Sequence, residues 1–159
     1  MTAAERKITP ADIMPSKDYA AKRTELRRNL IPVKKNRRIE VGPFATFYFE
    51  NFDTMWLQVH EMLHIEKGGE EQIAGELEAY NPLIPQGNEL IATLMLEIDD
   101  PVQREKILKQ LASVEESVAF EIAGTRVKGT PTEYEDRTTP DGLGYSFVTL
   151  ERDRFDFSR

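Results

Sequence analysis

The sequence predicts an α+β fold in which helices, including an αα-hairpin, pack on a mostly antiparallel sheet. Two observations predict this class. Short segments with apolar or aromatic residues at every second position recur in both halves of the chain, and two segments with helical apolar spacing are separated by Gly68-Gly69. With 159 residues the chain can bury one core, so we expect residues 1–159 to form a single domain with an N-terminal arm at 1–15.

The first elements are expected to be helical. Thr9 precedes a proline at the first helical position, which favours a short turn there. Ser16 is the candidate cap of a longer helix, and Pro32 is expected to end it. One face of this helix is predicted to carry Tyr19, Arg23, Leu26 and Leu30.

A strand pair and the helical hairpin come next. Residues 38–41 and 44–49 alternate in polarity around Gly42-Pro43, which predicts two short strands. Caps within 51–54 begin a helix to about Lys67, and a second helix is expected at 70–80. Because the glycines favour a tight turn, these helices are predicted to run antiparallel.

The remaining segments complete the sheet. Residues 90–98 are apolar at nearly every position, which indicates a central strand covered on both faces. Asp100-Pro101 opens a helix that we expect to turn Val102, Leu108 and Leu111 inward. Further strands are predicted at 118–122, 124–128 and 145–150, with a mobile loop at 129–144.

Composition limits the compartment and the chemistry. The chain contains no cysteine, which excludes disulfides, thiolate metal sites and a cysteine nucleophile. The N-terminus has no apolar signal region and no apolar stretch is long enough to cross a bilayer, so we expect a cytoplasmic protein without a membrane partner.

The net charge of −7 is unevenly distributed. Residues 1–38 hold 11 Lys and Arg against 4 Asp and Glu, whereas the remaining residues hold 10 against 24. The densest basic cluster, Lys34–Arg38, follows a predicted helix, where cations favour the negative end of the helix dipole. Because no nucleic-acid-binding motif accompanies the charge, we expect no nucleic-acid partner.

Several strings of residues carry a family resemblance that spans nearly the whole chain. They are Val41-Gly42-Pro43, Phe49-Glu50-Asn51, Gln58–Leu63, Ile65–Gly69, Glu76–Pro85 and Glu89–Leu94, and Ala79-Tyr80-Asn81-Pro82-Leu83-Ile84-Pro85 is the most specific part. On these strings the chain resembles a bacterial domain-of-unknown-function family. The family's genes often lie beside genes for rubrerythrin-like and iron–sulfur oxidoreductase-like proteins. The resemblance therefore implies a protein partner of the iron or redox type.

One pattern, His60-Glu61-Met62-Leu63-His64, carries chemistry of its own. Two histidines four residues apart on a helix can bind one zinc ion, and the glutamate between them can take a proton from metal-bound water. The third ligand has to be a carboxylate, because the chain has only two histidines. The predicted hairpin places Glu76 beside His60, with Glu78 as the second choice.

Helical phase favours a structural interpretation of the same residues. The apolar stripe centres on Val59 and Leu63, which leaves His60 against Trp56 at a helix–sheet boundary and His64 toward solvent. Glu61 would be catalytic only in a metallohydrolase.

Iron is the alternative metal, since di-iron bundles use a Glu-x-x-His pair such as Glu61 and His64. With only two histidines, that centre would require a homodimer.

Two functional hypotheses therefore remain. The favoured one is an accessory or binding protein that acts with an iron or redox partner, and the alternative is a small zincin-like metal-dependent hydrolase. Zinc and iron are both compatible with the pattern, and the sequence favours neither.

Overall fold

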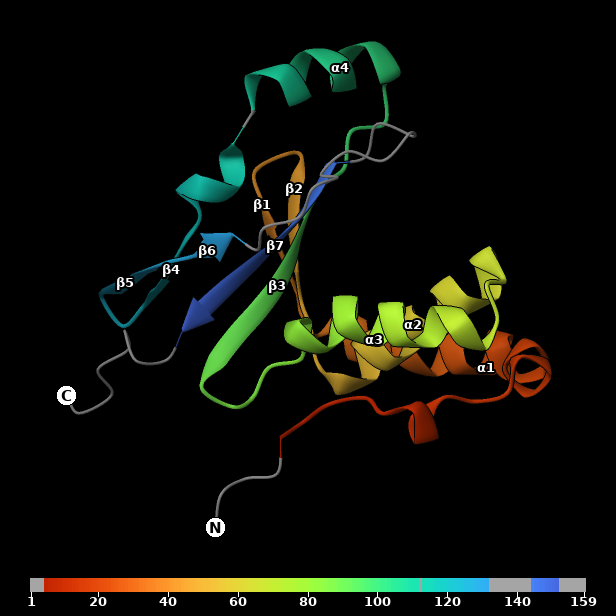
Figure 1. The fold of residues 1–159 in the computed structure, drawn as a ribbon. Coiled ribbons are helices and arrows are strands. Elements are labelled where there is room, and N and C mark those ends of the chain that lie inside the picture. Colours follow the sequence, from red (N-terminus) through yellow and green to blue (C-terminus); the bar gives the residue numbers. More distant parts are fainter. Residues whose placement is uncertain (1–4, 112, 132–143, 152–159) are drawn as a thin grey trace. The chain divides into compact units, whose positions relative to one another are not determined.

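The computed structural model describes residues 5–111, 113–131 and 144–151, the last of these by their backbone (Figure 1). Contacts within the chain divide it into two compact units. The first unit consists of Met1–Arg37 and Glu50–Gln86, and the second of Arg38–Phe49 and Gly87–Arg159. The single domain expected for residues 1–159 stays a prediction. No helix in the described part of the chain is long and apolar enough to span a bilayer.

The first unit is built from helices. The 3-10 helix η1 (Pro10–Asp12) leads into α1 (Ser16–Lys35), and the hairpin consists of α2 (Phe52–Glu66) and α3 (Glu70–Tyr80), followed by η2 (Asn81–Leu83). Asn51 caps α2, since its side chain accepts a hydrogen bond from the Thr54 amide at 2.9 Å. Lys67 and Gly69 both take positive φ angles between the two helices, so the predicted hairpin and its glycine turn are confirmed.

The long helix differs from its prediction at both ends. Pro15 rather than Ser16 occupies the cap position, and the helix runs through Pro32 to Lys35. The expectation that Pro32 ends the helix was therefore wrong. A proline removes one backbone hydrogen bond and crowds the carbonyl four residues earlier, and here only a single helical turn follows it. Lys34 and Lys35 stabilise that turn because they lie at the negative end of the helix dipole.

The second unit contains the sheet. Its five strands have the order β1-β2-β3-β7-β6, and each neighbouring pair is antiparallel. The strands are β1 (Arg38–Val41), β2 (Ala45–Phe49), β3 (Glu89–Leu96), β6 (Thr130–Pro131) and β7 (Gly144–Glu151). As predicted, β3 is central, with Ile91 on one face and Ala92 and Leu94 on the other at 0–2% exposure. A separate two-stranded sheet pairs β4 (Ala119–Ile122) with β5 (Thr125–Lys128).

Two predictions for this unit were wrong. Val102 was expected to face inward from α4 (Pro101–Gln110), but its side chain is 79% exposed. The expectation was wrong because Val102 lies about 120° around the helix from Leu108, which is half-buried. Thr130 and Pro131 were assigned to a loop and instead pair with β7 as β6. The rest of that predicted loop, 132–143, lies outside the described residues.

Candidate functional site

His60 is fixed within the first unit by both of its ring nitrogens. Its side chain is 2% exposed, and Nε2 accepts a hydrogen bond from the Met14 amide at 2.9 Å. An accepting Nε2 requires the proton on Nδ1, which therefore donates to the Trp56 carbonyl at 2.8 Å. Burial lowers the pKa of His60 below its usual 6.5, so the ring is neutral at pH 7. In this arrangement neither nitrogen has a lone pair available for a metal ion.

Aromatic rings enclose the same imidazole. Trp56 lies with its ring centroid 3.9 Å from that of His60, and Tyr19 of α1 lies 5.0 Å away. The predicted contact between His60 and Trp56 is therefore confirmed. The contact was expected at a helix–sheet boundary, but it lies between α2 and the segment that leads into α1. This segment is also held by the Trp56 indole, which donates to the Asp12 carbonyl at 2.9 Å.

Glu61 is bound by two side chains of α1. Arg23 approaches the carboxylate with Nε and Nη2, each 2.8 Å from one of its oxygens, and the Tyr19 hydroxyl donates to Oε1 at 2.6 Å. The Arg23 hydrogen bonds, followed by that of Tyr19, lower the pKa of Glu61 to about 2 although burial opposes them. Burial and the bond to Glu61 raise the pKa of Tyr19. Glu61 is thus an ionised partner in a part-buried ion pair.

The other candidate ligands do not join His60 and Glu61. Glu76 accepts a hydrogen bond from Gln72 on its own helix at 2.8 Å, and Glu78 is exposed. His64 is half-buried rather than turned to solvent as predicted, and its ring makes a T-shaped contact with that of Tyr19 at a centroid distance of 5.9 Å. Within residues 5–111, 113–131 and 144–151, no three His, Asp or Glu side chains are grouped so that they could hold a metal ion. The donor set predicted for zinc therefore does not fit a metal site in this arrangement.

A cleft of about 650 Å³ opens beside these histidines. Its walls are η1 and the start of α1 on one side and α2 and the start of α3 on the other. The lining is mostly apolar, with Pro10, Ile13, Met14, Pro15, Leu63, Ile73 and Ala74. Polar atoms come from Ser16, Tyr19, His60, His64 and Glu70, while Gly69 completes the wall. The cleft lies entirely within the first unit, so its geometry depends only on the packing of these helices.

Sequence analysis identified His60 and His64 as candidate site residues but missed most of the groups that surround them in the structure. A signal for Tyr19 and Arg23 was present, since both recur with Leu26 and Leu30 on one predicted face of α1, and the structure turns that face inward. A charged residue on an inward face needs a partner of opposite sign, and Glu61 is that partner. Met14 could not be found in this way, because its contribution is a backbone amide that carries no sequence signal.

The family follows from comparison with known proteins. Residues 7–156 match the family model described as "Protein of unknown function (DUF3501)". The chain belongs to the DUF3501 family. A crystal structure described as a novel protein of unknown function from Burkholderia pseudomallei K96243 is similar to this DUF3501 chain, with a TM-score of 0.82 and 32% sequence identity. The similarity covers 92% of this chain and 77% of that one. No protein with a curated description matches.

The family match agrees with the predicted resemblance, and the helices and antiparallel sheets of the structure confirm the predicted α+β fold. Neither description names a ligand or an activity.

Proposed function

We propose that this chain is a non-catalytic binding protein of the cytoplasm, whose cleft in the first unit holds a ligand with an apolar body and one hydrogen-bonding end. The observation that carries the proposal is the cleft itself. Its volume of about 650 Å³ lies within the range of roughly 300–1,000 Å³ that is typical of small-molecule sites. Such sites combine apolar walls with a few polar groups, as this lining does.

His64 is the polar group best placed to orient the ligand. It lines the cleft, it is half-buried, and no described residue hydrogen-bonds its ring. His60, by contrast, uses both ring nitrogens on the backbone and has none left for a ligand. A hydroxyl, amide or carboxylate on the ligand would therefore bond to His64, while Leu63 and Ile73 contact its apolar part.

The state of Glu61 supports binding over hydrolysis. A general base works best when its pKa is close to the working pH. The pKa of Glu61 is about 2, and both of its oxygens are occupied by Arg23 and Tyr19. The zincin-like hydrolase would require Glu61 to leave this ion pair and His60 to give up a backbone bond, so the geometry lends that alternative no support.

The accessory role is the second part of the proposal. The gene neighbourhood of the resembled family supports a partner of the rubrerythrin-like or iron–sulfur type. Affinity purification of the chain from its native host, grown under peroxide stress and at low oxygen, should recover such a protein. If neither type is recovered under either condition, the iron or redox part of the proposal is wrong and the cleft hypothesis stands alone.

The cleft is tested by filling it. Ala74 lines the cleft and is exposed, so Ala74→Phe should occupy the space without disturbing the core. Ala20→Phe makes the same change at an exposed position of α1 outside the lining. With 8-anilinonaphthalene-1-sulfonate as the probe, we expect wild type and Ala20→Phe to bind alike, and Ala74→Phe to bind about tenfold more weakly, which corresponds to about 1.4 kcal/mol.

A second measurement addresses the natural ligand. Native mass spectrometry of wild-type protein from its host should show a bound small molecule that Ala74→Phe lacks and Ala20→Phe retains. Equal probe binding by all three proteins, together with no bound mass in any of them, would contradict a ligand site in this cleft.

A further inference from the structure

The outer strand β1 leaves one side of the five-stranded sheet open. β1 pairs with β2 on its inner side, and no described strand pairs with its outer side. All four residues of β1 are exposed, including Ile39 at 45% and Val41 at 54%. Open edges with exposed apolar residues are surfaces on which a further strand can pair.

An apolar face leads up to this edge. Ile39 and Val41 share a face with Phe47 and Phe49, because Ile39 pairs with Phe47 in the antiparallel register. On this face Ala92 of β3 is fully buried, and Phe120 of β4 meets Phe49 edge-on at 6.1 Å. Exposure therefore rises from the centre of the sheet to β1.

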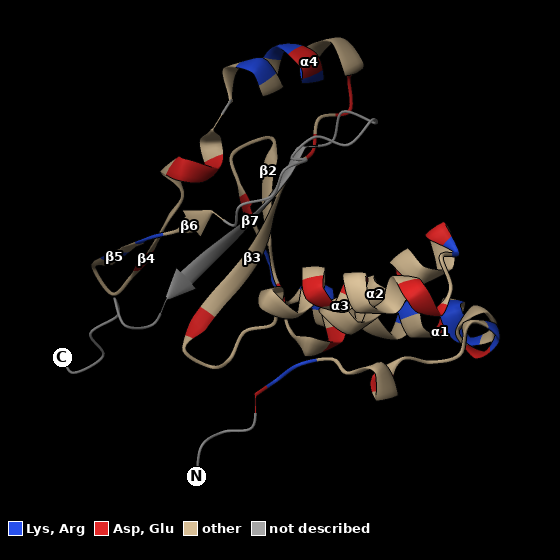
Figure 2. Cartoon of the chain, viewed as in Figure 1, with Lys and Arg blue, Asp and Glu red and all other residues tan. Residues whose placement is uncertain are grey.

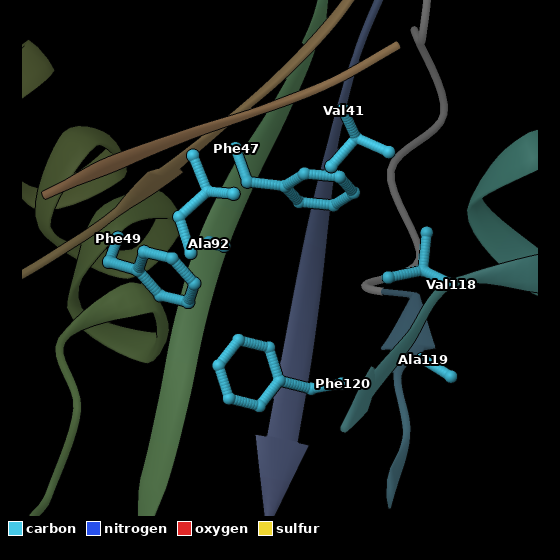
Figure 3. A pocket seen from close by; sticks show the side chains of 8 residues that line it. Val41, Phe47, Phe49, Ala92, Val118, Ala119 and Phe120 are labelled. Carbon is cyan, nitrogen blue, oxygen red and sulfur yellow. The ribbon is translucent and has the colours of Figure 1, made fainter. Parts of the chain in front are cut away.

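Residues 118–120 cover the centre of this sheet face, and a small cavity of about 70 Å³ lies where that cover ends. Ile39 and Val41 of β1 line it together with Val118, Ala119 and Phe120. Figure 3 shows Val41 and Phe47 across the cavity from Val118 and Phe120. The residues that cover the centre of the sheet thus leave Ile39 and Val41 partly uncovered.

We infer that β1 is a homodimer interface, in which β1 of a second copy pairs with it antiparallel about a twofold axis at Ile39. The argument for a second copy is the self-complementarity of Arg38-Ile39-Glu40. With the axis at Ile39, Arg38 lies opposite Glu40 of the second copy, and Glu40 lies opposite Arg38 of that copy. The two Ile39 side chains meet on the apolar face. Opposite charges across an antiparallel pair stabilise it, and like charges destabilise it.

Neighbouring registers are disfavoured by the same reasoning. An axis at Arg38 or at Glu40 places two like charges opposite each other. An axis between Ile39 and Glu40 would place an apolar residue opposite a charged one, on the wrong face of the sheet. Arg38 and Glu40 already form an ion pair along the strand in the single chain, which places both side chains on the same face. Pairing would exchange these contacts for contacts between copies.

The register is tested by cysteine crosslinking, since the chain has no cysteine of its own. Directly opposite residues in an antiparallel pair lie about 4.5–5.5 Å apart at Cα, within the range of a disulfide. Ile39→Cys should therefore crosslink to its counterpart under mild oxidation of the full chain. Val41→Cys is the matched control. It is more exposed, but its counterpart would lie about 14 Å away, so it should not crosslink.

Charge reversal tests the interface without a covalent bond. By sedimentation equilibrium up to about 1 mM we expect a weak dimer, because a four-residue strand buries little area. Glu40→Arg should weaken it about tenfold or more, and the exchanged pair Arg38→Glu with Glu40→Arg should restore it. Val102→Lys, at an exposed apolar residue of α4, should have no effect. A chain that is monomeric at every concentration, or that crosslinks equally at positions 39 and 41, would overturn the inference.

Discussion

Replacing Glu61 with glutamine should destabilise the first unit substantially. The substitution preserves shape but removes the charge that Arg23 and Tyr19 bind, and it turns an NH₂ group toward one of the Arg23 donors. The pKa of Glu61 is about 2 in the folded chain, compared with an ordinary value of 4.5. At 1.36 kcal/mol per pKa unit, that difference corresponds to about 3 kcal/mol.

Solvent reduces this figure somewhat. The Glu61 side chain is 15% exposed and that of Arg23 is 32% exposed, so part of the interaction is screened. We therefore expect a loss of about 2–3 kcal/mol in the free energy of unfolding at pH 7. Glu78→Gln is the matched control, because Glu78 is an exposed glutamate of α3 and its substitution should cost less than about 0.5 kcal/mol.

Urea unfolding followed by the fluorescence of Trp56 measures this unit specifically, since Trp56 is the only tryptophan and belongs to α2. A cycle with Arg23→Gln and the double variant isolates the coupling between the two charges. The result that would refute the reasoning is a Glu61→Gln variant as stable as Glu78→Gln at pH 7.

The pH dependence provides a second, independent check. The folded pKa of Glu61 lies below the unfolded value, so the folded chain binds fewer protons at this site. The contribution of Glu61 to the free energy of unfolding is present above pH 4.5 and is lost as the pH falls from 4.5 toward 2. The difference in unfolding free energy between wild type and Glu61→Gln should therefore become smaller over this pH interval. A gap that does not change with pH would show that the charge is not its cause.

Four further predictions concern the histidines, the metal content and the basic segment. His60 has a folded pKa below its usual 6.5, so its contribution to the free energy of unfolding is present above pH 6.5 and falls at lower pH. The urea midpoint of His60→Gln should therefore change less than that of wild type between pH 8 and 5.5. His64→Ala should change the unfolding free energy by less than about 0.5 kcal/mol. Elemental analysis of protein purified without chelator or nickel should show no stoichiometric metal, and one metal per chain lost on His64→Ala would contradict this. Lys34–Arg38 should not confer duplex DNA binding tighter than about 10⁻⁶ M at physiological salt.

Sequence patterns predicted most of the elements because their signals are local. The glycine turn, a helix cap within 51–54 and the apolar run of β3 each depend on a few adjacent residues, and all three were confirmed. Pro32 shows the limit of such rules, since its penalty can be outweighed near a helix end. Basic residues gather on α1, which carries seven Lys and Arg against two acids (Figure 2). That concentration was visible in the sequence, but the pairing of Arg23 with Glu61 was not.

The candidate site was harder to predict because its geometry depends on segments distant in the chain. The His-Glu-x-x-His spacing correctly predicted that His60 and His64 lie one turn apart on α2. It carried no information about which other segments contact that part of the helix. His60 is 46 residues from Met14, and Glu61 is 38 residues from Arg23. These tertiary contacts decide that the motif packs against α1 and the segment before it.

The path of the chain between its two units has a consequence for synthesis on the ribosome. The β1–β2 segment is inserted into the first unit, and Arg37 and Glu50 on either side of it are joined by a hydrogen bond of 3.1 Å. All residues of the first unit have been made once Gln86 is reached. The β1–β2 hairpin cannot pair with β3 until β3 has been synthesised, and the five-stranded sheet cannot be completed until β7 has been synthesised. During that interval the nascent chain exposes apolar strand residues, which chaperones recognise.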